Sequence, residues 1–335
     1  MQTRPAAAHG ARVRRAAGKG RDVRMVPDKI TVDGRRLRFS ISDNSDAHGP
    51  EGPGSPPVWA VNVHGYFAGG GMYWRESSDL AQHLGWRVLN PSLPGFGGSD
   101  PLPWEHVNMR HISHQVLELL DHVGAEHAVL LGHSMGGAVA VQFANDHPER
   151  TLGIVYRDGV ATPAWKRRRG VLAAMLAPVL PDVAGVADIV IATLMDTPDL
   201  LIGRRLSSTL RGMWPDARRN MRAVGRTLPV GAMLMSIDMR TEVKSAVDHG
   251  IPFLPVWGCF DRIVNAATAR EFSELVHREV VWVPGGHSWM LPRPQGQVDV
   301  LRFLDQGRAF VQETLARRHH LSAGGTVGAA LSALR

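Results

Sequence analysis

The feature that most constrains the fold is a regular alternation of apolar runs and helix-patterned segments between residues 58 and 159. Short runs rich in Val, Leu and Ile are each followed by a segment with helical periodicity. Strands separated by helices of this length form βαβ units, with helices on both faces of a mostly parallel sheet. We therefore expect an α/β fold. The expected strands are 58–65, 86–93, 127–134, 151–159, 253–261 and 279–286, and the expected helices are 74–85, 111–124, 135–148 and 298–318.

Two departures from this alternation suggest the domain organisation. Residues 29–42 alternate apolar and polar side chains around Asp33-Gly34, which predicts a hairpin. Residues 160–250 are Met- and Leu-rich and helical in pattern, with no clear strand, which predicts a lid inserted into one core domain. The expected parts are a disordered basic tail (1–28), the first part of the core (29–159), the helical lid (160–250), the second part of the core (251–320) and a frayed C-terminal tail (321–335).

The net charge of +7 is concentrated at the N-terminus. Residues 1–24 carry seven arginines or lysines and one aspartate, so the rest of the chain is close to neutral. This Ala- and Gly-rich stretch lacks both apolar periodicity and the apolar region of a secretion signal, as is typical of a disordered arm. We therefore expect no nucleic-acid partner. The basic run KRRR (166–169) at the lid entrance leaves peripheral contact with an anionic membrane surface open.

A single cysteine, Cys259, excludes an intrachain disulfide and favours a reducing compartment, so we expect a cytoplasmic protein. We expect Cys259 itself to be a small buried apolar residue. No Cys/His cluster has the spacing of zinc ligands. The sequence therefore predicts neither a metal nor another cofactor.

The segment LLGHSMGGAVAV (130–141) places Ser134 between an expected strand and an expected helix. At a sharp strand-to-helix turn the neighbouring backbone is crowded, so glycine is favoured at 132 and 136 and the serine hydroxyl is lifted into the open. The N-terminus of the following helix adds N–H donors and a partial positive charge. This pattern predicts Ser134 as a nucleophile.

A serine nucleophile needs a base, and the base needs an orienting acid. His287, in PGGHSWM after the last expected strand, is the candidate base. Asp261 follows the preceding strand in VWGCFDRIV and is the candidate acid. The loop VHGYFAGGG (63–71) follows the first central strand, and its glycines allow the backbone to approach an oxyanion closely. The backbone N–H groups of Tyr66 and Met135 are the expected oxyanion hole.

Five motifs in this order resemble the α/β-hydrolase family: HG, PGFGGSD, GHSMGG, WGxxDxIV and GGHS. The resemblance covers about residues 58–160 and 250–305. The sequence GHSMGG at the strand-to-helix turn that carries Ser134 resembles the corresponding segment of esterases and monoacylglycerol-lipase-like enzymes. The resemblance implies a catalytic triad of Ser134, Asp261 and His287.

Other roles were considered for several of these positions. Asp158 ends the strand 151–159 and could replace Asp261 as the acid, although a loop-capping role is favoured. His64 is expected to position a loop through backbone hydrogen bonds, and His133 is expected to pack inside the turn.

Residue types narrow the reaction within the family. Ser134 excludes epoxide hydrolases and haloalkane dehalogenases, because those enzymes use a carboxylate at this position and form an alkyl ester. The expected reaction is hydrolysis of a hydrophobic carboxylic ester through a seryl-acyl intermediate. The same triad also supports carbon–carbon bond hydrolysis, cofactor-free perhydrolysis or acyl transfer, and a non-catalytic ligand-binding relative is a further alternative. The lid residues that suggest an apolar substrate, or simply pack the lid onto the core, are Met175, Leu176, Leu194, Met195, Leu200, Leu201, Met213, Trp214, Met233, Leu234 and Met235.

Overall fold

The computed structural model describes residues 24–44, 55–167 and 206–324. Most of the predicted N-terminal tail, the lid segment 168–205 with its apolar residues from Met175 to Leu201, and the end of the chain lie outside the described residues. The same holds for Arg168 and Arg169 of the basic run at the lid entrance.

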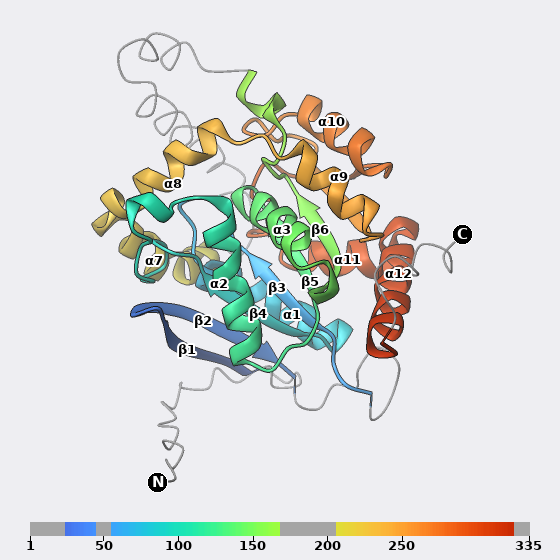
Figure 1. The fold of residues 1–335 in the computed structure, drawn as a ribbon, viewed down its shortest axis with the longest axis horizontal. Coiled ribbons are helices and arrows are strands. Elements are labelled where there is room, and N and C mark those ends of the chain that lie inside the picture. Colours follow the sequence, from blue (N-terminus) through green and yellow to red (C-terminus); the bar gives the residue numbers. More distant parts are fainter. Residues whose placement is uncertain (1–23, 45–54, 168–205, 325–335) are drawn as a thin grey trace.

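An eight-stranded sheet forms the centre of the molecule, in the order β1-β2-β4-β3-β5-β6-β7-β8 (Figure 1). The pairs from β4 to β8 are parallel, while β1 and β2 are antiparallel additions at one edge. This confirms the mostly parallel sheet. The strands are β1 (Arg24–Val32), β2 (Arg35–Asp43), β3 (Trp59–Val63), β4 (Arg87–Ser92), β5 (Ala128–His133), β6 (Thr151–Arg157), β7 (Phe253–Gly258) and β8 (Val281–Val283).

The hairpin at the edge of the sheet turns where the sequence predicts it. Val32 pairs with Arg35, and the intervening Asp33 and Gly34 both have positive φ, of 48° and 75°. Such a two-residue turn matches the twist of the paired strands. The boundary of the tail needs correction, because β1 begins at Arg24 rather than after residue 28 and pairs along its whole length with β2.

Helices cover both faces of the sheet, since two separate apolar layers pack against alternate side chains of the strands. Figure 1 shows α2 and α3 in front of the strands and α7 and α8 beside them. The helices of the core are α1 (Trp74–Leu84), α2 (Met109–His122), α3 (Met135–Asp146), α10 (Ala266–Val276), α11 (Gln295–Phe303) and α12 (Asp305–Ser322). The described helices of the lid region are α7 (Leu206–Arg222), α8 (Val224–Ser236) and α9 (Arg240–Asp248), and short 3₁₀ turns are η1 (Gly70–Tyr73), η2 (Trp104–His106), η3 (Pro148–Arg150) and η4 (Pro163–Arg167).

Three expectations about local structure were wrong or incomplete. The expected closing helix 298–318 is two helices, because the backbone at Leu304 is extended (ψ 144°) between α11 and α12. Helix α10 was not predicted. Cys259 is exposed rather than buried, because it lies just past the end of β7, where the chain leaves the sheet.

A buried ion pair lies beneath the site. Arg157 at the end of β6 is fully buried, and its guanidinium pairs with Glu76 of α1 and donates to Asn62 Oδ1 of β3 (2.8 Å). A buried charge is tolerated only when paired and hydrogen-bonded in this way. The pair therefore ties α1 to two central strands at the end of the sheet from which the candidate residues emerge. None of the described helices is sufficiently long and apolar to cross a membrane.

Candidate active site

Ser134 occupies the predicted sharp turn between β5 and α3. Its backbone has φ 53° and ψ −118°, a strained conformation for a non-glycine residue. A Cβ added at Gly136 would lie 2.1 Å from the Val63 carbonyl oxygen, and one at Gly132 would lie 2.6 Å from the Gly136 oxygen. The prediction that glycine is required on both sides of Ser134 is thus confirmed. The turn is held by the Ser134 amide, which donates to the Arg157 carbonyl (3.0 Å).

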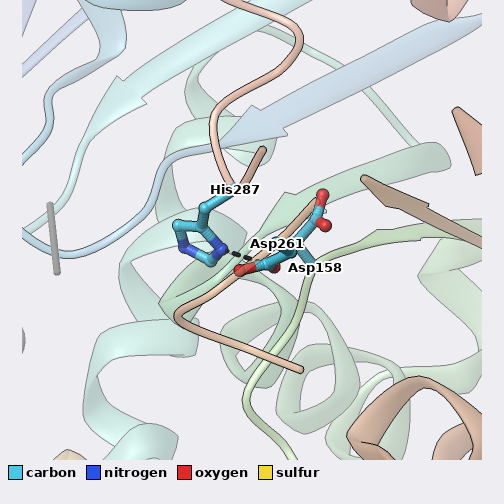
Figure 2. A group of neighbouring side chains, drawn as sticks. All are labelled: Asp158, Asp261 and His287. Carbon is cyan, nitrogen blue, oxygen red and sulfur yellow. Dashed lines mark hydrogen bonds and ion pairs between the residues drawn. The ribbon is translucent and has the colours of Figure 1, made fainter. Parts of the chain in front are cut away.

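His287 and Asp261 meet directly at the same end of the sheet. The imidazole Nδ1 lies 2.9 Å from Asp261 Oδ2, as Figure 2 shows. The other carboxylate oxygen accepts from the amides of Ile263 and Val264 (2.8 Å each), which fixes the orientation of Asp261. A carboxylate held at Nδ1 leaves Nε2 as the nitrogen for proton transfer.

Asp158 is close by but is used differently. Its Oδ1 accepts from the Gly258 amide and its Oδ2 from the indole N–H of Trp289, both at 2.8 Å. Burial and the neighbouring Asp261 raise the pKa of Asp158 well above its ordinary value of 3.8. These bonds agree with the loop-capping role, since Asp158 links the end of β6 to the end of β7 and to the loop after β8.

Among the residues that the structure describes, the same three side chains also form a group with the spacing of metal ligands. One ligand atom from each of Asp158, Asp261 and His287 lies within 4.8 Å of the others. His287 and Asp261 are joined by a hydrogen bond, and both Asp158 oxygens accept from N–H donors of Gly258 and Trp289. This donor and acceptor pattern fits an acid–base pair with a supporting carboxyl group.

The sequence suggested that His133 packs inside the turn, and the structure shows that its ring also makes two hydrogen bonds. Its Nε2 lies 2.9 Å from the His287 carbonyl oxygen, and its Nδ1 lies 2.6 Å from the Tyr73 hydroxyl. A carbonyl only accepts, so Nε2 carries the proton and Nδ1 accepts from Tyr73. Burial lowers the pKa of His133 well below its ordinary value, in agreement with a neutral ring. The chain Tyr73–His133 therefore anchors the backbone of His287.

His64 positions a loop through two backbone hydrogen bonds, as predicted. Its Nδ1 donates to the Gly65 carbonyl (2.8 Å), and its Nε2 accepts from the Leu93 amide (2.9 Å). Complete burial lowers the pKa of His64 to about 4. The neutral ring joins the loop after β3 to the loop after β4.

A cavity of about 180 Å³ brings these elements together. Ser134, His287, Gly65 and Tyr66 lie on its wall, and a Cβ added at Gly65 would approach the Ser134 Cβ to 3.1 Å. Met135 is the buried first residue of α3. The remaining wall is largely apolar: Phe67, Ala68, Met72, Val160, Trp165, Met213, Ala217, Leu234, Ile263 and Leu291.

The singled-out lid residues that the structure describes divide into three groups. Met213 and Leu234 line the cavity. Met233 and Met235 pack against the core, and Trp214 is 59% exposed. Their apolar character therefore reflects both the cavity and lid packing.

Two residues at the site were missed in the sequence. Tyr73 hydrogen-bonds His133, and Asn220 of α7 bonds the backbone of the loop that follows β3. Tyr73 follows the glycine run of that loop, a signal that could have drawn attention to it. Asn220 stands in an Arg-rich helix with no motif around it, and only its buried position reveals it.

Comparison with known proteins assigns the chain to a family. The family model described as the alpha/beta hydrolase fold matches residues 60–294, so the chain belongs to this family. A protein of Mycobacterium phage D29 named "Putative non-heme haloperoxidase" is 29% identical over 260 residues, which are 75% of this chain and 87% of that protein.

Solved structures show the same fold at low identity. A thermophilic esterase from Thermogutta terrifontis matches with a TM-score of 0.59 and 20% identity, over 87% of this chain and 99% of the other. The 2-hydroxy-6-oxo-6-phenylhexa-2,4-dienoate hydrolase from Rhodococcus sp. strain RHA1 matches with a TM-score of 0.61 and 22% identity, over 84% and 98%.

Proposed function

We propose that this protein hydrolyses carboxylic esters with a hydrophobic acyl or alcohol part through a seryl-acyl intermediate. One observation carries the proposal: Ser134, in a strained turn, shares the wall of an apolar cavity with His287, whose Nδ1 is hydrogen-bonded to Asp261. A nucleophile, a base and an orienting acid in this arrangement are the requirements of acyl transfer.

The proposed reaction begins when Ser134 Oγ attacks the ester carbonyl carbon and His287 Nε2 takes the hydroxyl proton. The N–H groups of Tyr66 and Met135 stabilise the negative oxygen of the tetrahedral intermediate. The carbon–oxygen bond to the alcohol then breaks, and His287 gives its proton to the leaving alkoxide. Water, deprotonated by His287, attacks the acyl-enzyme, and collapse of the second intermediate returns the proton to Ser134 and releases the acid.

The substrate preference follows from the cavity. Its volume of about 180 Å³ and its wall of aliphatic and aromatic side chains favour a compact apolar group over a sugar or a charged peptide. Esterase activity is also named for one of the structural neighbours, whose fold this chain shares.

A fluorophosphonate probe and p-nitrophenyl esters of increasing chain length test the proposal. We expect the probe to label Ser134 and short apolar esters to be hydrolysed, with kcat reduced by about 10⁴ to 10⁶ in Ser134→Ala. Ser288→Ala is the matched control, because Ser288 lines the same cavity and is expected to be dispensable for both. Labelling without ester turnover would exclude ester hydrolysis and leave the triad for a different acyl or carbon–carbon reaction. Labelling that survives in Ser134→Ala would refute the assignment of the nucleophile.

A further inference from the structure

The loop that follows β3 carries Tyr66, one of the two proposed oxyanion donors, and its backbone is strained at the next residue. Phe67 has φ 62°, in the left-handed region that a bulky side chain rarely occupies. Such a conformation persists only when surrounding contacts over-determine it. A hydrogen bond within the loop, from the Ala68 amide to the Gly65 carbonyl oxygen (3.2 Å), supports this conformation, and further contacts come from the lid.

Asn220 of α7 supplies the hydrogen bonds to this segment. Its side-chain Nδ2 donates to the carbonyl oxygens of both Phe67 and Ala68, at 2.8 Å each. Its Oδ1 accepts from the amide of Gly97, also at 2.8 Å, in the loop that follows β4. The side chain thus uses both amide hydrogens and one oxygen lone pair on three backbone groups from two separate loops.

Asn220 is buried from solvent. The residue is 1% exposed, so water does not replace these bonds when they are lost. One face of α7 turns toward the core. It carries Met213, then Asp216 and Ala217 three and four positions later, and then Asn220. A Cβ added at Gly69 would lie 2.7 Å from the Asp216 side chain, which shows how closely this face packs on the loop.

Helix α8 adds a second connection to the same loop. The hydroxyl of Tyr66 donates to the Thr227 carbonyl oxygen (3.1 Å), and the Tyr66 ring packs edge-on against Phe96. The side chain of Tyr66 is therefore held by α8, while the peptide groups that follow it are held by Asn220.

We propose that Asn220 is a positioning residue for the oxyanion hole, which makes lid helix α7 part of the catalytic machinery. The amide of Asn220 fixes the Phe67 and Ala68 carbonyl groups, and this limits the movement of the preceding residue Tyr66, whose N–H is the proposed donor. Displacement of such a donor by about 1 Å is worth on the order of 100-fold in rate. The inference rests on the proposed ester hydrolysis.

The test compares Asn220→Leu, which keeps the size of the side chain and removes its polar atoms, with wild type. For a short p-nitrophenyl ester we expect kcat to fall about 10- to 100-fold with KM changed less than about threefold, because the donor acts on the tetrahedral state. Binding of phenylboronic acid, which forms a tetrahedral adduct with the serine, is expected to weaken in the same proportion. Binding of the alcohol product, which makes no oxyanion, is expected to remain unchanged.

Two further variants separate positioning from stability. Asn220→Asp keeps the acceptor for the Gly97 amide and loses the two donors, so it is expected to lose kcat as Asn220→Leu does while remaining folded. Met221→Ala, at the exposed neighbour on the same helix, is the control and is expected to retain both kcat and boronate binding.

The outcomes are distinct. If both Asn220 variants lose thermal stability but keep kcat and boronate affinity, or lose alcohol and boronate binding equally, the inference is overturned. If wild type neither hydrolyses esters nor binds the boronate, the proposed function fails and the inference fails with it. If wild type does both and the variants match it, the inference alone fails.

Discussion

The two sides of the cavity are supported by different parts of the molecule. On the acid–base side, His287 is held by Asp261 at its ring and by His133 at its carbonyl oxygen, and these residues emerge from the parallel strands or the loops directly after them. On the proposed oxyanion side, the loop after β3 is held from two directions. His64 holds it within the core, and Asn220 of α7 and the Thr227 carbonyl of α8 hold it from the lid.

The difference shows which parts of the fold support each side of this site. The acid–base side is fixed by the sheet, whose strands are paired over their length and covered on both faces. The proposed oxyanion side also depends on helices inserted between β6 and β7, the part of the sequence that follows no strand pattern. Changes in the lid are therefore expected to alter mainly transition-state stabilisation and to leave the pairing of His287 with Asp261 intact.

The largest expected effect is on the acid–base side. Asp261→Asn is expected to lower kcat by about 10³ to 10⁴, because the amide can hold His287 in the wrong tautomer and does not stabilise the imidazolium. Asp158→Asn is the matched control and is expected to keep kcat within about tenfold, since its neutral side chain still accepts from Trp289 or Gly258. Steady-state kinetics on one ester measure kcat for both variants. A larger loss of kcat in Asp158→Asn than in Asp261→Asn would make Asp158 the acid.

On the oxyanion side, buried His64 is expected to make stability fall in acid. Its folded-state pKa of about 4 lies below its ordinary 6.5, so the unfolded state binds the proton first and stability is lost as pH falls between these values. The full shift corresponds to about 3 kcal/mol. Urea unfolding at pH 7 and pH 4 should show a smaller loss for His64→Gln than for wild type. Equal losses would mean that His64 is not held neutral.

On the acid–base side, buried Asp158 is expected to act in the opposite direction. Its folded-state pKa is raised above 3.8, so the native state retains the proton that the unfolded state releases, and stability falls as pH rises through this window. Asp158→Asn cannot titrate and should gain stability relative to wild type as pH increases from about 4. A constant difference between the two proteins across that range would contradict a raised pKa.

The smallest expected effect comes from Tyr73, whose hydrogen bond to His133 supports the backbone of His287. Tyr73→Phe removes the hydroxyl that donates to His133 and accepts from the Gly65 amide (3.4 Å), a loss of about 1 kcal/mol per bond. We expect kcat to fall several-fold, with KM nearly unchanged and unfolding free energy lowered by about 1–3 kcal/mol. Tyr156→Phe is the comparison. The Tyr156 hydroxyl also accepts a hydrogen bond from a backbone amide, that of Ala161, but no hydrogen bond of the described residues joins it to the proposed triad. An equal fall in kcat for both would show that the effect is a general loss of stability.

The sequence by itself determined the order of the strands, most of the core helices, the hairpin at Asp33-Gly34 and the glycines around Ser134. Each of these depends on local physics: the periodicity of apolar side chains, the backbone freedom of glycine and the crowding of a sharp turn. The candidate residues Ser134, Asp261 and His287 were found for the same reason, since each follows a recognisable strand and the ends of parallel strands meet at one edge of the sheet.

Only the tertiary structure decided which side chains support these residues. Asn220 reaches Phe67, Ala68 and Gly97 across more than a hundred positions of sequence, and Asp158 is set apart from Asp261 by the donors that surround it. Such contacts carry no local pattern, because they depend on how elements distant in the sequence pack and on which polar groups that packing removes from water. Burial also raises the pKa of Asp158 and lowers that of His64, so the charges that these residues carry were decided by the fold.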